Sequence, residues 1–309
     1  MKVVFMGTPD FSVSILKAIY EAGHRVCACV TGEDKKRGRG REVSPTPVKE
    51  YALKRGLNVY QPHILKCEET VSYLKGLSAD IFVVAAYGKI LSSEILSIPK
   101  YGCINVHASL LPKYRGASPI QSAVIAGDKI SGVTIMQMNE GLDTGDILMQ
   151  ESIEIAADET GESLFLKLAD LGAELIVSAL ERIEAGEITA VKQDESRASY
   201  TKLISKDMGK LDLNKSAEHL ERLIRGMYSW PGTYLVFSGK KIKVFCADVI
   251  KGMTGESPGT VISADKEGIR VQTGEGLLNI TDLQAEGKKR MPVNEFIKGF
   301  KIDPGDKFE

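Results

Sequence analysis

Residues 2–30 read KVVFMGTPDFSVSILKAIYEAGHRVCACV, and this stretch decides the fold. An apolar run at residues 3–6 ends in a turn with Gly7 and Pro9, and apolar residues at helical spacing follow the turn. A second apolar run closes the stretch. A strand, a helix and another strand at this spacing indicate parallel strands joined by a right-handed crossover. The sequence therefore predicts a Rossmann-like, doubly wound and mostly parallel α/β sheet.

The first turn does not have the sequence of a dinucleotide-binding turn. It lacks the second and third glycines of the GxGxxG pattern, and no acidic residue follows the second strand before Glu33. We therefore expect a Rossmann-like scaffold that binds no NAD.

The same pattern continues to residue 186, which we take as the end of the first domain. A continuous apolar run at residues 81–86, IFVVAA, is typical of a central strand that is buried on both faces. The pattern predicts further helices at 48–55, 70–77, 93–97 and 163–184, and further strands at 59–61, 103–107, 132–137 and 147–155. We expect the last two strands to be antiparallel.

The rest of the chain changes character. Residues 187–204 are polar and weakly periodic, which is typical of a linker. A helical connection is expected at residues 206–226. Short alternating segments between Gly-rich turns follow at 233–237, 241–249, 259–263, 268–273 and 277–283. We expect residues 205–309 to form a small OB-like β-barrel.

The composition excludes several classes of protein. A chain of 309 residues is long enough for two domains, and its net charge of −1 creates no global field that attracts nucleic acid. The five cysteines show neither zinc-site spacing nor a disulfide framework, so we expect no metal and a reducing cytoplasm. The N-terminus has no basic leader, and no apolar run reaches the ~18 residues of a membrane helix. We expect a cytoplasmic monomer with no membrane partner.

Positive charge is instead concentrated locally. Residues 35–41, KKRGRGR, carry five Lys and Arg in seven positions. The run is either a solvated connection, as most charge runs are, or a flexible arm that contacts a polyanion. Two clusters in the barrel, KKIK at residues 240–243 and KKR at 288–290, are open to the same two interpretations.

The candidate site lies in residues 103–116, CINVHASLLPKYRG. Asn105 and His107 are two positions apart on a predicted strand, so their side chains point to the same face. Pro112 and Gly116 then end the regular structure. Because ligands of parallel α/β sheets bind at the carboxyl ends of the strands, we expect the reaction site to lie where these two side chains face the loop.

Asp143 is the third candidate, within GLDTGD at residues 141–146. In acyl transfer to an amine, Asn and His N–H groups can stabilise the oxyanion while Asp and His move protons. No covalent nucleophile is then required. The structural alternatives stay open at this point, since His107 can be a hydrogen-bonded core residue and Asp143 can merely shape a turn.

Five motifs together resemble one known family. They are GTPDF at 7–11, GRG at 38–40, NVHASLLPKYRGASP at 105–119, GLDTGD at 141–146 and WPG at 230–232. The two central motifs resemble the formyltransferases and hydrolases that use 10-formyltetrahydrofolate, and the others narrow the resemblance to the members that act on methionyl-tRNA. The likeness spans essentially the whole chain. It implies transfer of the formyl group of 10-formyltetrahydrofolate to the methionine amine of initiator methionyl-tRNA, for translation initiation.

The resemblance also implies roles for individual residues. The family's catalytic trio matches Asn105, His107 and Asp143. The folate is expected at Ser109, Leu110, Leu111 and Pro112, with the pterin near Tyr87 and Gly88. Contacts with tRNA are expected from Arg39, Arg41 and Lys206.

Two alternatives remain open. A folate-dependent formyltransferase of a small amine, such as a nucleotide-sugar or glycinamide ribonucleotide, would carry the same central motifs, although the C-terminal barrel disfavours the glycinamide enzyme. The other alternative is a non-catalytic RNA-binding protein on the same scaffold. The intact Asn105, His107 and Asp143 count against it.

Overall fold

The computed structural model describes residues 1–37 and 42–309, which divide into two compact units. The first unit comprises Met1–Pro119, Ile130–Glu154 and Phe165–Lys202. The second comprises Ile120–Lys129, Ile155–Leu164 and Leu203–Glu309. Each unit contains segments that are far apart in the sequence, whereas the domains expected from the sequence are continuous.

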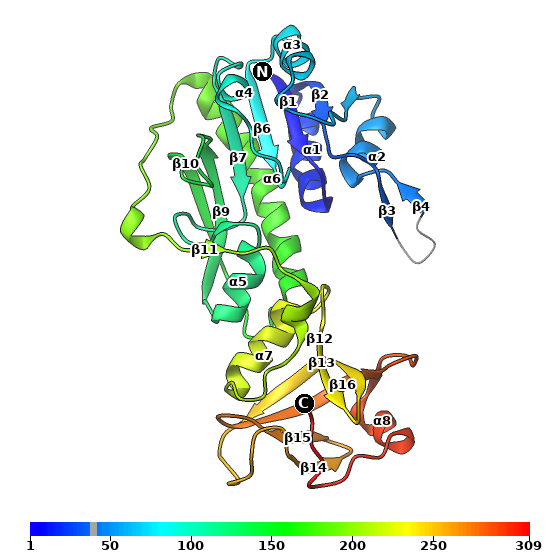
Figure 1. Ribbon diagram of the computed structural model, residues 1–309. Helices are drawn as coiled ribbons and strands as arrows, with labels where there is room; N and C mark the ends of the chain where they lie inside the picture. The colour runs from blue at the N-terminus through cyan, green and yellow to red at the C-terminus, as the bar shows by residue number, and fades with distance from the viewer. Residues whose placement is uncertain (38–41) are drawn as a thin grey trace. The chain divides into compact units, whose positions relative to one another are not determined.

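The first unit is built on a seven-stranded sheet (Figure 1). In spatial order its strands are β10 (Ile147–Glu154), β9 (Ile130–Gln137), β7 (Cys103–His107), β6 (Ile81–Ala85), β1 (Lys2–Gly7), β2 (Arg25–Val30) and β5 (Val59–Tyr60). The five strands from β7 to β5 run parallel to one another, and β9 runs antiparallel to both of its neighbours, β7 and β10. The predicted Rossmann-like, mostly parallel sheet is therefore confirmed.

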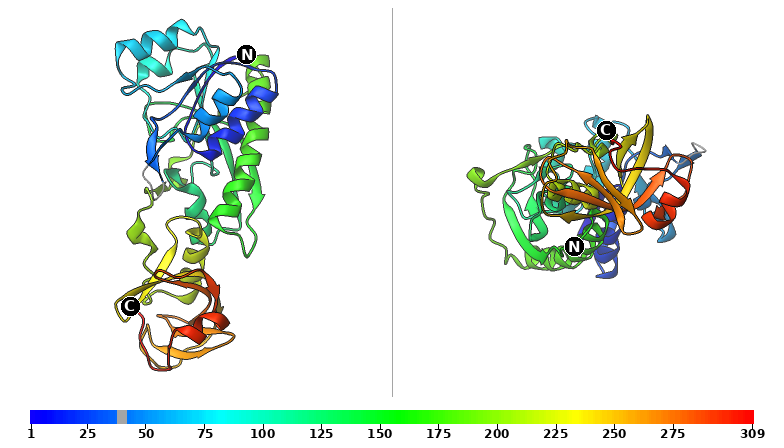
Figure 2. Two further views of the ribbon diagram at one scale, coloured as in Figure 1. Left: turned by 90° about the vertical axis from the view of Figure 1, so that its right-hand side faces the viewer. Right: turned by 90° about the horizontal axis from the view of Figure 1, so that it is seen from below.

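Helices cover both faces of this sheet. They are α1 (Asp10–Glu21), α2 (Pro47–Lys54), α3 (Glu68–Gly76), α4 (Ser93–Leu96) and α6 (Gly161–Ala185), whereas α5 (Pro119–Ala126) lies almost entirely in the second unit. On one face, Val4 of β1 shares a core with Leu74 of α3. On the other face, Gly172 of α6 lies so close to Ile15 of α1 and Val106 of β7 that a Cβ there would come within 3.0 Å of Ile15. Figure 2 shows α3 on one side of the sheet and α1 with α6 on the other.

The basic segment after β2 differs from the irregular loop that the sequence predicts. Its flanks form a short antiparallel hairpin of β3 (Lys35–Arg37) and β4 (Glu42–Ser44), in which Lys35 pairs with Ser44. Charged residues without apolar alternation give no strand signal, so the pattern of the sequence does not reveal this ladder. Arg39 and Arg41 lie outside the described residues.

The second unit contains an antiparallel sheet. Its strands are β12 (Thr233–Phe237), β13 (Lys240–Ile250), β14 (Val261–Asp265), β15 (Gly268–Gln272), β16 (Leu277–Ala285) and β17 (Met291–Pro292). They lie in the order β12-β13-β16-β15-β14, with β17 beside β16. The five predicted strands are confirmed, whereas β17 and the helix α8 (Val293–Gly299) are not predicted by the sequence. Alternate apolar residues, among them Leu235, Ile242 and Ile280, form the core.

The two outer strands of this sheet are joined by the final residues of the chain. Glu309 exchanges two main-chain hydrogen bonds with Val236 of β12, of 2.8 and 2.9 Å. The Phe308 N–H donates to the carbonyl oxygen of Gly259, just before β14, at 2.9 Å. These contacts bring the sheet toward the barrel form that the strand count predicts.

The helix predicted at residues 206–226 is wrong in its first half. Lys206–Gly209 forms only a 3-10 turn, and the α-helix α7 (Ala217–Gly226) begins later. The Ser216 hydroxyl accepts a hydrogen bond from the His219 N–H and caps α7. In the part of the chain that the structure describes, no helix is both long and apolar enough to cross a bilayer.

Candidate active site

The predicted site residues of the first unit meet at the carboxyl ends of β6 and β7. His107 is the last residue of β7, and Tyr87 and Gly88 follow β6, its parallel neighbour. The loop from β9 to β10 returns over β7 and carries Asp143 to Asn105. Five of the predicted residues therefore come from three chain segments to the edge where ligands of open α/β sheets bind.

The three predicted catalytic side chains contact one another. Asn105 Nδ2 donates to Asp143 Oδ1 at a long 3.4 Å, and His107 Nδ1 lies 3.7 Å from Asp143 Oδ2. His107 is 6% exposed and Asp143 is 15% exposed, so the carboxylate and the imidazole face each other with little water between them.

The opposite edge of the imidazole is held by the main chain. His107 Nε2 lies 3.0 Å from the carbonyl oxygen of Tyr114. A carbonyl only accepts hydrogen bonds, so Nε2 carries the hydrogen in this arrangement. His107 can therefore donate from Nε2 to a substrate oxygen only if that oxygen replaces the Tyr114 carbonyl.

Asp143 is held in one orientation by its backbone and its side chain. Its φ of 51° lies in the left-handed region, which Asp tolerates better than most residues. Its Oδ2 accepts a 2.8 Å hydrogen bond from the Gly116 N–H. A Cβ on the nearby Gly145 would lie 1.6 Å from the carbonyl oxygen of Gln137, so only glycine fits there. The carboxylate thus links β7 to the loop that follows it.

The loop predicted to hold folate is shaped from within. Ser109 Oγ donates to the Lys113 carbonyl oxygen at 2.6 Å, and the Leu111 N–H donates to Thr134 Oγ1 at 3.0 Å. Gln150 Nε2 donates to the Leu111 carbonyl oxygen at 2.9 Å. Ser109 and Leu111 are buried, so their side chains fix the shape of the loop. A ligand would therefore contact mainly the atoms on the exposed surface of the loop.

Tyr87 offers a polar group that the protein itself does not use. It is 5% exposed, and its hydroxyl has no hydrogen-bond partner among the described residues. Burial raises the pKa of this hydroxyl to about 12, so it remains a neutral donor. The next residue, Gly88, has a φ of 73° and no described atom within 4 Å of where a Cβ would be. An unpartnered buried hydroxyl is a group that a ligand with hydrogen-bonding ring atoms, such as a pterin, could satisfy.

The described residues do not test the predicted tRNA contacts. Arg39 and Arg41 lie outside the described residues. Lys206 is exposed, begins the 3-10 turn and belongs to the second unit. The structure therefore leaves these three roles as predictions.

Sequence reasoning missed a contact on the far side of the loop after β7. There β8 (Arg115–Gly116) pairs in parallel with β11 (Tyr200–Thr201), within the segment predicted as a linker. Ser199 Oγ accepts a hydrogen bond from the Tyr114 N–H at 2.8 Å. Arg115, one of two charged residues in the motif of residues 105–119 together with Lys113, is a sequence signal that a partner exists, and it does not say where that partner lies.

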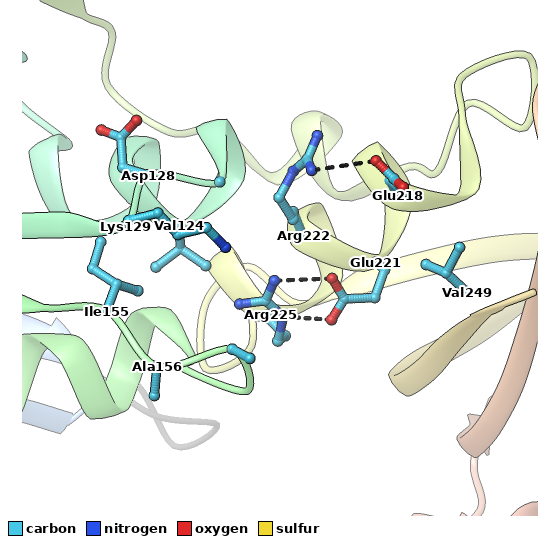
Figure 3. Close-up of a pocket in the computed structure, with 12 residues that line it drawn as sticks. Val124, Asp128, Lys129, Ile155, Ala156, Glu218, Glu221, Arg222, Arg225 and Val249 are labelled. Atoms are coloured by element: carbon cyan, nitrogen blue, oxygen red, sulfur yellow. Dashed lines mark hydrogen bonds and ion pairs between the residues drawn. The ribbon is translucent and has the colours of Figure 1, made fainter.

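A separate hollow of ≈ 170 Å³ lies in the second unit, between residues of α5, the segment after β10 and α7 (Figure 3). Its arginines are already engaged. Arg225 pairs with Glu221 and donates to the carbonyl oxygen of Glu159 at 2.7 Å, and Arg222 Nε donates to that of Ile125 at 3.2 Å. The predicted catalytic residues all belong to the first unit, so this hollow is not part of their site.

Two family models match the chain. The formyl transferase model matches residues 1–180, and the model of the formyl transferase C-terminal domain matches residues 203–301. A methionyl-tRNA formyltransferase from Lachnospira eligens is 51% identical over 310 residues, which cover 99% of this chain and 98% of that protein. One from Agathobacter rectalis is 49% identical over 308 residues, which cover 100% of this chain and 99% of that protein.

Solved structures share the fold. The sugar 3N-formyl transferase WlaRD, determined in the presence of dTDP and 5-N-formyl-THF, has a TM-score of 0.68 and 18% identity, covering 94% of this chain and 99% of that chain. HypX from Aquifex aeolicus in complex with tetrahydrofolic acid has a TM-score of 0.64 and 18% identity, covering 98% of this chain and 49% of that chain. At such identity the likeness concerns the fold alone. The two matched domains and the full-length relatives show that this chain belongs to the methionyl-tRNA formyltransferase family.

Proposed function

We propose that this protein transfers the formyl group of 10-formyltetrahydrofolate to the α-amino group of methionine on initiator methionyl-tRNA, for translation initiation in the cytoplasm. The observation that carries the proposal is the contact of Asp143 with Asn105, His107 and Gly116 at the carboxyl end of β7. The names and full-length coverage of the relatives support methionyl-tRNA as the acceptor.

Asn105 is the proposed donor to the formyl oxygen as negative charge develops on it. Its side-chain amide has two N–H groups, and the contact with Asp143 occupies one of them through a long bond. The other is available to a substrate. One such preorganised donor is worth ~3 kcal/mol in acyl transfer.

His107 and Asp143 are proposed to handle the protons. As the methionine α-amine forms a bond to the formyl carbon, it must lose a proton. The nitrogen that leaves that carbon must gain one. His107 lies next to the Asp143 carboxylate, and an imidazole and a carboxylate can each accept and donate a proton, so the pair can take one proton and return another. The chemistry requires neither a covalent intermediate with the protein nor a metal.

The folate is proposed to lie against the loop of Ser109, Leu110, Leu111 and Pro112, with its pterin near Tyr87 and Gly88. The unpartnered Tyr87 hydroxyl and the space beside Gly88 support this orientation. Arg39, Arg41 and Lys206 are proposed to contact the phosphates of the tRNA, for which flexible cations are suited. The protein is proposed to act as a monomer.

One assay tests the function. The purified protein is supplied with 10-formyltetrahydrofolate and, in separate reactions, with charged initiator tRNA, an amino nucleotide-sugar or glycinamide ribonucleotide. Formyl-methionyl-tRNA is the expected product. If only a small amine were formylated, that amine would be the acceptor instead of methionyl-tRNA. If no acceptor were formylated, the remaining interpretation would be a non-catalytic RNA-binding protein.

A further inference from the structure

The segment predicted as a linker is part of the first unit. Residues 191–201, here called the linker strap, are fixed at both ends. Val191 exchanges two 2.8 Å main-chain hydrogen bonds with Ile147 at the start of β10. The other end of the strap forms β11, which pairs with β8. The strap therefore spans from the strand that follows the Asp143 loop to the loop that follows β7.

Arg115 holds the middle of the strap. Its side chain is fully buried, and the strap accepts all five of its N–H groups. Nε and Nη2 donate to Gln193 Oε1 at 3.1 and 2.8 Å. Nη1 and Nη2 donate to the Glu195 carboxylate at 2.9 and 2.7 Å, and Nη1 also donates to the Tyr200 hydroxyl at 2.9 Å. The Glu195 carboxylate is 68% exposed, so these hydrogen bonds attach a surface segment to a buried side chain.

Gln193 connects this buried charge to the candidate active site. Its Nε2 donates to the main-chain oxygen of Asp143 at 2.8 Å and to that of Gly145 at 2.7 Å. The guanidinium of Arg115 can only donate, so it fixes Oε1 on its own side and directs Nε2 toward the two carbonyls. The orientation of the amide therefore follows from Arg115.

The loop that Gln193 contacts needs such support. Gly141 and Leu142 are exposed, and Asp143 has a left-handed backbone. The contact with His107 is 3.7 Å long, so a small displacement of the loop would separate the two groups. Misplacement by 1 Å in an active site can cost about 10²-fold in rate.

We propose that Gln193 is a positioning residue for formyl transfer: oriented by Arg115, it holds the backbone of Asp143 so that the carboxylate stays between Asn105 and His107. This inference rests on the proposed function. Gln193 acts through Asp143 and is not itself a catalytic residue. The linker strap, which the sequence predicts to be part of a linker, thus helps to hold the catalytic side chains in place.

A change of one side-chain group tests the proposal. Gln193→Glu keeps the size of the side chain and can still accept from Arg115, but it sets a carboxylate against the carbonyl oxygens of Asp143 and Gly145. Gln193→Met keeps the approximate shape and removes both sets of hydrogen bonds. Ser196→Ala is the matched control, because the Ser196 hydroxyl bonds only within its own turn, to Asp194.

The measurement is steady-state formylation of initiator methionyl-tRNA by the full chain, well below the Tm of each variant. We expect kcat to fall by about 10²-fold in Gln193→Glu and by roughly tenfold or more in Gln193→Met, with the KM for 10-formyltetrahydrofolate and for tRNA within about threefold of the wild type. Ser196→Ala should match the wild type.

Three outcomes would overturn the inference. The first is a kcat of Gln193→Glu close to that of the wild type. The second is a loss of activity that only follows a lower Tm, and the third is a rise in both KM values with kcat unchanged, because either of these would indicate a merely structural role. A wild-type protein that formylates no methionyl-tRNA would instead refute the proposed function, and this inference with it.

Discussion

Replacing Asp143 with Asn removes one negative charge while the shape of the site is retained. Asn tolerates the left-handed backbone at this position as well as Asp does, and its side-chain oxygen can still accept from the Gly116 N–H. What is lost is the attraction between the carboxylate and a protonated His107, whose Nδ1 lies 3.7 Å from Oδ2, together with the long hydrogen bond from Asn105, whose Nδ2 would then face an N–H group.

The size of this loss follows from the distance. At an effective dielectric constant of about 20, unit charges at this separation interact by about 4.5 kcal/mol. Asp143 is 15% exposed, and water at the carboxylate reduces the interaction, so roughly 3 kcal/mol is the working value. The predicted decrease in kcat is therefore about 10²-fold.

The assay is formylation of methionyl-tRNA with saturating 10-formyltetrahydrofolate, with circular dichroism and Tm as controls for folding. If the two groups act as a pair, the double variant His107→Ala/Asp143→Asn should be little slower than His107→Ala alone. A folded Asp143→Asn protein within about threefold of the wild-type kcat would refute the reasoning, as would losses that multiply in the double variant.

Three further changes test other residues. Tyr87→Phe removes the unpartnered hydroxyl, so Tm should not fall while the KM for 10-formyltetrahydrofolate rises; an unchanged KM would remove Tyr87 from the folate site. Gly145→Ala places a Cβ 1.6 Å from the Gln137 carbonyl oxygen, so the loop must shift and kcat should fall by about 10²-fold; a wild-type rate would contradict the loop geometry. The hydrogen bonds from Arg115 lower the pKa of the Glu195 carboxyl below its ordinary 4.5, so this pairing stabilises the fold above that pH and is lost as the pH falls through the lowered value. Thermal unfolding should show the wild type more stable than Glu195→Gln at neutral pH and similar to it once the pH lies below the lowered pKa of Glu195, and a gap that persists there would contradict this.

Local patterns predict the parallel sheet and the pairing on β7. The runs at residues 3–6 and 81–86 are continuous apolar segments, and they form the adjacent strands β1 and β6. Asn105 and His107 are predicted to share a face because side chains alternate along a strand, and both contact Asp143 in the structure. Asp143 is predicted from its Gly-bracketed loop and from the chemistry of acyl transfer, and the family resemblance supports its role. No periodicity relates it to a strand nearly forty positions earlier, so its contact with β7 is seen only in the structure.

The sequence does not predict the contacts that depend on long-range packing. Arg115 and Gln193 are separated by 78 positions, and the second lies in a polar segment without a pattern. The charged hairpin of β3 and β4 is missed for the same reason. Residues 120–129 and 155–164 belong to the second unit although the sequence around them continues the pattern of the first. Such groupings depend on which surfaces pack together, which local propensity does not encode.

A single-turnover measurement tests most directly that the carboxyl end of β7 is the site of transfer to methionyl-tRNA. Excess protein and 10-formyltetrahydrofolate are mixed with charged initiator tRNA, using the wild type, Asn105→Ala and Ser196→Ala. We predict formyl-methionyl-tRNA from the wild type and Ser196→Ala at equal rates, and a rate about 10²-fold lower from folded Asn105→Ala. No product from the wild type, or an equal rate from Asn105→Ala, would contradict it.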